Sequence, residues 1–276
     1  YIEKFGTTII PQYYSFGDTV YGDELNMAPA EFYERMKNGE LPLSQANNPA
    51  VIEDKFRAIL NKGGNIIHVA FSSALSGSYN NVCMVVNELT EEYPDAKITV
   101  IDSLNVSLAE SILVIKANEM KANGASYEEV VEKLEDMKNH LNVWFTVDDL
   151  FHLQRGGRVS KAVAVVGSAL NLKPFLYITN EGGLSSAGTV RGRKKSLKTI
   201  VERMKASLGE NPDYTLPVGI VHSICLEDAQ AVADMIKEET QFTNIIINDI
   251  SPSIGTHAGP GAIGILYYGD KKPAAK

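Results

Sequence analysis

The sequence predicts an α/β protein in two parts: a parallel α/β domain over residues 1–148 and an α+β domain over residues 149–276. In the first part, short apolar runs alternate with amphipathic helical patterns, which is typical of a parallel sheet with helices on its faces. In the second part, a hairpin pattern stands beside further helices and strands. A chain of 276 residues is long enough to build two cores of ordinary size.

Three apolar runs in the first part predict strands. They are NIIHVAF (65–71), KITVID (97–102) and NVWFTV (142–147). Helical periodicity covers residues 49–64, 78–93, 104–124 and 126–141. The last of these helices starts with Ser126 and Glu129, which have the spacing of a capping box. The chain opens as if in the middle of a domain, so a further strand is expected before Tyr1.

The second part does not continue the regular alternation of strands and helices. A helix of small residues is expected at 160–172, a hairpin that turns at Glu181-Gly182-Gly183 at 173–190, and a basic amphipathic helix at 193–209. Two more strands, at 216–224 and 244–250, flank a helix at 226–240. This mixture predicts the α+β arrangement of the second part.

Composition and charge narrow the classes of function. The net charge of −8 argues against general nucleic-acid binding. Residues 1–148 carry 11 Lys and Arg against 22 Asp and Glu, whereas residues 149–276 carry 15 against 12, so the basic side is either a docking face or ordinary solvated surface. The two cysteines suggest no disulfide framework or zinc site. No apolar run approaches the ~18 residues of a membrane span, and no secretory leader opens the chain. We therefore expect a cytoplasmic protein without stable membrane insertion.

Hydroxyl groups cluster where the first predicted strand gives way to a helix, in FSSALSGSYNNV. In parallel sheets, ligands settle beyond the carboxyl ends of the strands, and a helix N-terminus offers free N–H groups with partial positive charge. The segment contributes Ser72, Ser73, Ser76 and Ser78, and Gly77 allows close approach to the backbone. These features predict a carboxylate or phosphate site. The alternative is helix capping by Ser76 or Ser78, which needs no ligand.

Two other segments offer similar groups. LPLSQANN places Ser44 before a helix, where capping is again the alternative. SIGTHAGPGAIG surrounds Thr256 and His257 with glycines, which indicates an unusual backbone or the close approach of another group. His257 can donate a hydrogen bond to an anion and can gain charge near neutral pH. The alternative is a structural histidine.

Several chemical motifs are absent from the sequence. GPGAIG (259–264) matches G-x-G-x-x-G, but only 12 residues follow it, too few for the helix and acidic residue of a dinucleotide site. No P-loop, H-E-x-x-H motif or group of metal ligands is present, so no cofactor or metal is expected. Ser76 lacks the glycines of a hydrolase elbow, which leaves a hydrolase of Ser76, His257 and Asp102 as a remote alternative.

Arginines and glycines combine in two further segments. LQRGGRVS contains Arg155 and Arg158, and TVRGRKKSLK contains Arg191 and Arg193. Guanidinium groups match phosphates in a bidentate way. The pattern predicts a patch that meets a nucleotide-bearing or acidic partner, and the alternative is a turn followed by a solvated helix face.

Together these segments resemble the DegV family. The matching pieces are ALSGSYNNV, VIDSLNVSLAES, LQRGGRVSKAVAVVGSALNLKPFL, RGRKK and IGTHAGPGAIG, in this order from about residue 7 to the end of the chain. The resemblance implies a two-domain fatty-acid-binding protein with the acyl chain buried in a tunnel between the domains. It also implies a role as the lipid-carrying subunit of bacterial fatty acid kinase. A separate ATP-binding, dihydroxyacetone-kinase-like subunit would then convert the bound long-chain fatty acid to an acyl phosphate for phospholipid metabolism.

The resemblance also assigns the site. It implies that the carboxylate is held by Ser76, by His257 and by a hydroxyl of the Leu43–Ala46 stretch, with Gly77 and Thr256 beside them. This chain has Leu43 in place of the family's threonine, so Ser44 is expected to supply that hydroxyl.

The resemblance leaves the catalytic role with the partner. His257 would assist by orienting the carboxylate or stabilising charge. Arg158, Arg191 and Arg193 are the residues expected to dock the kinase. A non-catalytic subunit is therefore expected in preference to an independent enzyme, and a stand-alone lipid sensor or carrier is the alternative.

Overall fold

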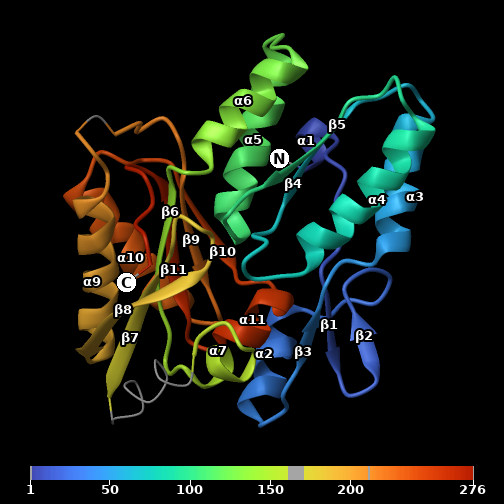
Figure 1. The fold of residues 1–276 in the computed structure, drawn as a ribbon. Coiled ribbons are helices and arrows are strands. Elements are labelled where there is room, and N and C mark those ends of the chain that lie inside the picture. The colour runs from blue at the N-terminus through green and yellow to red at the C-terminus, as the bar shows by residue number, and fades with distance from the viewer. Residues whose placement is uncertain (1, 161–170, 211, 276) are drawn as a thin grey trace.

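The structure, a computed structural model, describes residues 2–160, 171–210 and 212–275. Within these ranges the strands form sheets of three, two and six strands (Figure 1). The small-residue helix predicted at 160–172 falls largely on 161–170, outside the described residues.

The N-terminal segment builds a small antiparallel sheet and three helices. The strands, ordered β2-β1-β3, are β1 (Tyr13–Phe16), β2 (Thr19–Tyr21) and β3 (Leu43–Gln45). The helices are α1 (Ile2–Phe5), α2 (Pro29–Lys37) and α3 (Pro49–Leu60). The sequence did not predict this sheet, because strands of three or four residues show too little alternation to be recognised.

The predicted parallel pair of strands is confirmed. β4 (Ile66–Ala70) and β5 (Ile98–Asp102) pair in parallel, residue for residue. The predicted helices that follow them are α4 (Ser78–Glu92), α5 (Ser107–Ala122) and α6 (Tyr127–Met137). The predicted capping box is also present: the Glu129 N–H donates to Ser126 Oγ (3.3 Å), and the Ser126 N–H donates to the Glu129 carboxylate (2.7 Å).

The six-stranded sheet holds most of the second half of the chain. Its strands, in spatial order, are β10 (Ile245–Asp249), β9 (Val218–His222), β11 (Ile263–Tyr268), β6 (Leu141–Thr146), β7 (Leu172–Ile178) and β8 (Leu184–Arg191). Two helices, α9 (Arg193–Ala206) and α10 (Leu226–Glu239), cover the face turned away from the N-terminal half (Figure 1). The predicted hairpin of β7 and β8 is confirmed.

The strand predicted at 142–147 was assigned to the wrong sheet. As β6, it does not extend the parallel pair but lies antiparallel between β11 and β7. Val143 and Trp144 face opposite sides of the sheet, and both are buried. Burial on both faces produces an unbroken apolar run, which reveals neither the direction of a strand nor its partner. The division at residue 148 stays a prediction.

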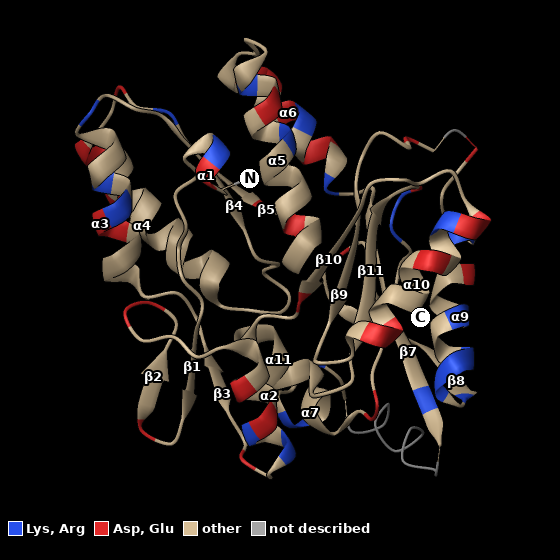
Figure 2. Ribbon diagram, turned by 180° about the vertical axis from the view of Figure 1, so that it is seen from behind, with Lys and Arg blue, Asp and Glu red and all other residues tan. Residues whose placement is uncertain are grey.

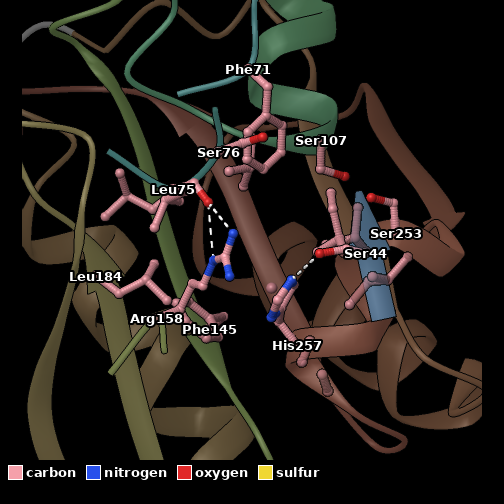
Figure 3. A pocket seen from close by; sticks show the side chains of 18 of the residues that line it. Ser44, Phe71, Leu75, Ser76, Ser107, Phe145, Arg158, Leu184, Ser253 and His257 are labelled. Carbon is pink, nitrogen blue, oxygen red and sulfur yellow. Dashed lines mark hydrogen bonds between the residues drawn. The ribbon is translucent and has the colours of Figure 1, made fainter. Parts of the chain in front are cut away.

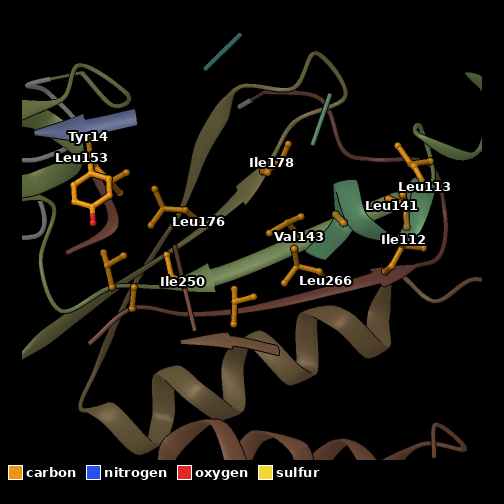
Figure 4. Close-up of a cluster of buried hydrophobic side chains, with 14 of the residues drawn as sticks. Tyr14, Ile112, Leu113, Leu141, Val143, Leu153, Leu176, Ile178, Ile250 and Leu266 are labelled. Carbon is orange, nitrogen blue, oxygen red and sulfur yellow. The ribbon is translucent and has the colours of Figure 1, made fainter. Parts of the chain in front are cut away.

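One hydrophobic cluster joins the two halves of the molecule (Figure 4). It combines side chains of β1, α5 and α7 with others from the inner face of the six-stranded sheet. The labelled members are Tyr14, Ile112, Leu113, Leu141, Val143, Leu153, Leu176, Ile178, Ile250 and Leu266. The N-terminal elements are thereby held against the sheet.

Two short helices lie between the small sheet and the large one. They are α7 (Phe151–Arg155) and α11 (Pro252–Ala258), and they contact each other (Figure 1). The glycine-rich segment therefore contains a helix. The expected close approach occurs at Gly255, where a Cβ atom would lie 2.4 Å from the hydroxyl oxygen of Tyr33. The expected unusual backbone occurs at Gly259, whose φ of 73° ends the helix.

Two hydrogen bonds connect the second half of the chain to the loops that follow β4 and β5. The Ser72 hydroxyl donates to the Gly182 carbonyl (2.9 Å). Lys272, near the end of the described chain, donates from Nζ to the Leu104 carbonyl (2.6 Å). Both contacts join the second half of the chain to the parallel strands of the first.

Candidate ligand-binding site

A pocket of about 170 Å³ opens between the two halves of the molecule (Figure 3). Its walls are mainly apolar, and they come from the loop after β4 and from β6, β7, β9 and β11. The polar side chains at the pocket are Gln12, Ser44, Gln45, Ser76, Ser107, Arg158, Ser253 and His257. The structure thus brings together Ser44, Ser76, Gly77 and His257 of the predicted ligand-binding set.

Ser44 and His257 form the central polar contact. Ser44 Oγ lies 2.6 Å from His257 Nε2, so β3 and α11 each supply one partner. Side chains alternate along a strand, and Leu43 is accordingly turned out to solvent with 60% of its surface exposed. With leucine at position 43 turned outward, Ser44 keeps its position at the pocket.

The surroundings of the His257 imidazole determine its charge and its tautomer. Burial, with the nearby charges of Arg158 and Arg155, lowers the pKa of His257 to about 4, so the ring is neutral at pH 7. Its Nδ1 atom is buried and has no hydrogen-bond partner among the described residues. A buried N–H without an acceptor is costly, which favours the proton on Nε2, where it donates to Ser44 Oγ. The Ser44 hydroxyl proton is then free for a ligand.

The backbone of Gly156 packs directly against the same ring. A Cβ atom at this position would lie 2.0 Å from His257 Nδ1. Only glycine allows the segment after α7 to approach the imidazole this closely. Gly156 thus contributes to holding the ring in its orientation.

Ser76 accepts a hydrogen bond at the start of α4 and forms part of the pocket wall. Its hydroxyl oxygen accepts from the Ser78 N–H (3.2 Å) and lies 3.0 Å from Ser78 Oγ. The Asn47 N–H donates to Ser78 Oγ (3.1 Å), which links the start of α4 to the segment after β3. The N-cap of α4 is Gly77, and no side chain among the described residues caps it, so the capping that the sequence offered for Ser76 or Ser78 is not confirmed. Ser76 and Gly77 do line the pocket.

The other predicted hydroxyl groups point elsewhere. Thr256 does not line the pocket; it is buried, and its hydroxyl donates to the Pro252 carbonyl of its own helix (3.0 Å). Ser72 bonds to Gly182, as described above. The backbone N–H of Ser73 donates to the Asp102 carboxylate (3.1 Å).

Arg158 lines the pocket. Its guanidinium donates from Nε (3.0 Å) and Nη2 (2.7 Å) to the Leu75 carbonyl (Figure 3). No carboxylate pairs with it among the described residues. Burial lowers the pKa of Arg158, but a guanidinium remains charged at neutral pH. The pocket therefore holds a positive charge with no opposite charge beside it.

The other two predicted docking residues lie away from the pocket. Arg193 is held by Asp228, with its Nε 2.8 Å from Asp228 Oδ2. Arg191 is exposed at the end of β8. Figure 2 shows Lys and Arg gathered along α9, which follows directly after Arg191. The structure therefore separates Arg158 from the basic surface that contains Arg191.

The arrangement contains no Ser–His–Asp triad. His257 bonds to Ser44 rather than Ser76. Asp102 instead accepts from the backbone N–H groups of Ser73 and Leu104. A catalytic imidazole needs an orienting acceptor at its second nitrogen, and Nδ1 of His257 has none among the described residues. The described ranges also contain no cluster of metal ligands and no helix with the length and hydropathy of a membrane span.

Comparison with known proteins decides the family. The family model described as "Uncharacterised protein, DegV family COG1307" matches residues 1–270. This chain belongs to the DegV family. A DegV domain-containing protein of Clostridium perfringens is 37% identical over 257 residues, which cover 92% of this chain and 88% of that protein.

Solved DegV structures share the fold. A DegV lipid-binding protein of Thermotoga maritima is 26% identical, with a TM-score of 0.83, over 98% of this chain and 94% of that one. The fatty acid kinase B3 protein of Streptococcus pneumoniae, loaded with linoleic acid, is also 26% identical, with a TM-score of 0.83, over 95% of this chain and 90% of that one. The expected two-domain DegV fold is confirmed.

Proposed function

We propose that this DegV protein binds a long-chain fatty acid in the pocket and presents its carboxylate to a separate ATP-dependent kinase subunit, which converts it to an acyl phosphate. The observation that carries the proposal is the lining of the pocket, which combines mainly apolar walls with a few polar side chains, among them Ser44, Ser76, Arg158 and His257. The fatty acids named for the structural relatives support the same ligand class.

The polar group suits a carboxylate. Burying a charged carboxylate without partners costs several kcal/mol or more, so the site must supply hydrogen-bond donors and positive charge. The Ser44 and Ser76 hydroxyls can donate, and the Arg158 guanidinium supplies the charge. Each methylene buried against the apolar walls contributes roughly 0.8 kcal/mol. Affinity is therefore expected to rise with chain length until the pocket is filled.

The part of the pocket at Ser76 and Arg158 borders a second hollow. A surface hollow on the first turn of α4 shares Leu75, Ser76, Gly77, Arg158 and Leu184 with the pocket. A carboxylate held at Ser76 would face this hollow, and a partner protein could deliver a phosphoryl group there. Because the sequence contains no nucleotide-binding motif, the phosphoryl donor is assigned to the partner.

Two measurements test ligand binding. Mass spectrometry of an organic extract of the purified protein is expected to show a long-chain acyl group. After lipid removal, hexadecanoic acid should bind, and Ser44→Ala should weaken it tenfold or more, because a hydrogen bond to a charged group contributes about 1.5 to 3 kcal/mol. Ser251→Ala, an exposed serine outside the pocket, is the matched control. An empty protein that fails to bind long-chain acids would refute the proposal.

The kinase step has a separate test. Loaded protein mixed with a purified kinase subunit and ATP should yield acyl phosphate, whereas a stand-alone carrier yields none. Arg191→Glu reverses an exposed charge away from the pocket, so it should lower the rate of acyl phosphate formation and leave the affinity for hexadecanoic acid unchanged. An equal rate for this variant would remove Arg191 from the docking surface.

A further inference from the structure

Two serines that line the pocket have no role in the site described so far. Ser107 is the first residue of α5 and Ser253 belongs to α11. Figure 3 shows their hydroxyls pointing toward one another across the pocket, beside Ser44. Neither hydroxyl has a hydrogen-bond partner among the described residues.

The backbone at Ser107 is also unusual. Its φ of 56° lies in the left-handed region, which is uncommon for residues other than glycine, asparagine and aspartate. This conformation costs of order 1 kcal/mol, and such outliers cluster at ligand sites. The backbone conformation is therefore a second observation that favours a role for Ser107 in ligand binding.

A plain acyl chain does not suit this pair. Methylene groups that cover two hydroxyls remove them from water and give nothing in return. A ligand hydroxyl suits it well, because it can donate to one serine and accept from the other. A carboxylate or ketone only accepts, so it uses the pair less fully.

The position of the pair indicates where the ligand hydroxyl lies. Ser253 and His257 are separated by four residues on α11, so their side chains share one face of the helix, with Cβ atoms about 6 Å apart. His257 holds Ser44, which is assigned to the carboxylate. A hydroxyl that reaches Ser253 must therefore sit within a few carbons of the carboxyl group.

We propose that the pocket is built for a fatty acid hydroxylated near its carboxyl end, such as a 3-hydroxy acid, with the hydroxyl bound between Ser107 and Ser253. This inference rests on the proposed function, because it takes the carboxylate to lie at Ser44. It adds the substrate class, which neither the apolar walls nor the carboxylate site specifies.

Competitive binding to the delipidated protein tests the inference. The probes are 3-hydroxyhexadecanoic acid and hexadecanoic acid, which differ by one hydroxyl. We expect the hydroxy acid to bind about tenfold more tightly, as a well-placed pair of hydrogen bonds allows. Ser107→Ala and Ser253→Ala should each reduce this ratio at least threefold while leaving the affinity for hexadecanoic acid equal or higher. Ser251→Ala should leave the ratio unchanged.

The outcomes separate the two proposals. If hexadecanoic acid binds and the hydroxy acid binds no better, the hydroxyl site is refuted and the fatty-acid function stands. The same holds if the ratio survives in the Ser107→Ala/Ser253→Ala double variant. If 12-hydroxyoctadecanoic acid gains as much over octadecanoic acid as the 3-hydroxy acid gains, the assigned position is wrong. If neither hexadecanoic acid nor its hydroxy form binds, the proposed function fails as well.

Discussion

At the scale of single residues, His257 shows how burial sets the chemistry of the site. The two residues of the Ser44–His257 contact are 213 positions apart in the sequence. Folding removes the ring from water, and the nearby arginine charges further disfavour a second proton. The ring therefore acts as a neutral donor that fixes Ser44.

The first prediction concerns this histidine. Burial lowers its pKa to about 4. A carboxylate bound nearby favours the charged ring, so ligand should raise the pKa, and by linkage the affinity should increase as the pH falls toward that raised value. NMR titration of the imidazole with and without hexadecanoic acid measures the shift. An unchanged pKa on saturation would place the carboxylate away from the ring.

The second prediction concerns Glu110 on α5. Burial raises its pKa to about 8 from 4.5, so between these values the folded protein binds more protons than the unfolded chain. The free energy of unfolding therefore falls as the pH rises from 4.5 to 8, because over this range the carboxyl group is ionised in the unfolded chain but still holds its proton in the folded protein. Glu110→Gln should remove that slope and stabilise the protein at pH 8 by roughly 1 to 3 kcal/mol, since part of the side chain still meets solvent.

Urea denaturation at pH 5, 6.5 and 8 measures the effect of this substitution. Glu119→Gln, at an exposed position on the same helix, serves as the control. If the free energy of unfolding depends on pH in the same way for the wild type and for Glu110→Gln, the pKa of Glu110 is not raised by folding.

At the scale of elements, α11 depends on a residue without a side chain. A Cβ atom at Gly255 would lie 2.4 Å from the Tyr33 hydroxyl oxygen, and that hydroxyl donates to the Ile250 carbonyl (2.8 Å). The third prediction is that Gly255→Ala pushes α11 away from α2. It should lower the free energy of unfolding by about 1 to 3 kcal/mol and weaken fatty-acid binding, because His257 lies on the displaced helix.

Chemical denaturation and ligand titration measure the two effects together. Gly183→Ala is a suitable control, because the added methyl group would meet its nearest atom, Thr179 Oγ1, at 3.7 Å. Equal destabilisation by both substitutions would mean that the contact with Tyr33 is not the cause.

The elements differ in how far the sequence could predict them. α4 and α6 were predictable because their apolar residues recur at helical spacing and Ser126 caps α6. The strand β6 was recognised, but its partners were not, because strand pairing is set by distant segments. The short elements β3, α7 and α11 were missed because a few residues do not establish a period.

The candidate site was predictable in part, for a physical reason. Ser44, Ser76 and His257 were found because hydroxyls and glycines stand out beside apolar runs. Their meeting in space could not be derived, since it depends on how β3 and α11 pack. Ser107 and Ser253 gave no signal, because an isolated serine has the same appearance in a pocket, a cap or a loop.

At the scale of the whole molecule, the pocket is shared by the two halves of the chain. The segments that line it run from Gln12 to Ser107 in the first half and from Val143 to Leu266 in the second. A ligand in this position contacts both halves and binds only when they are assembled. Binding should therefore stabilise the whole fold rather than one part of it.

The fourth prediction follows from this shared pocket. Hexadecanoic acid at 100 times its Kd should add about 2.7 kcal/mol to the free energy of unfolding and raise Tm in a single transition. Butyric acid, which buries few methylene groups, should leave Tm unchanged at the same concentration. Thermal denaturation followed by circular dichroism checks both. A ligand-dependent split into two transitions would contradict a pocket that both halves complete.

The contact between Gly156 and His257 has a consequence for other family members. The imidazole fits only because nothing projects from residue 156, where a single methyl carbon would lie 2.0 Å from Nδ1. A homologue with alanine or any larger residue there must move either the imidazole or the segment after α7, and a moved imidazole would break the tie to the serine. The residue at position 156 can therefore be used to sort DegV sequences. Those with glycine there can keep the Ser–His pair, and those with a larger residue are candidates for having lost it.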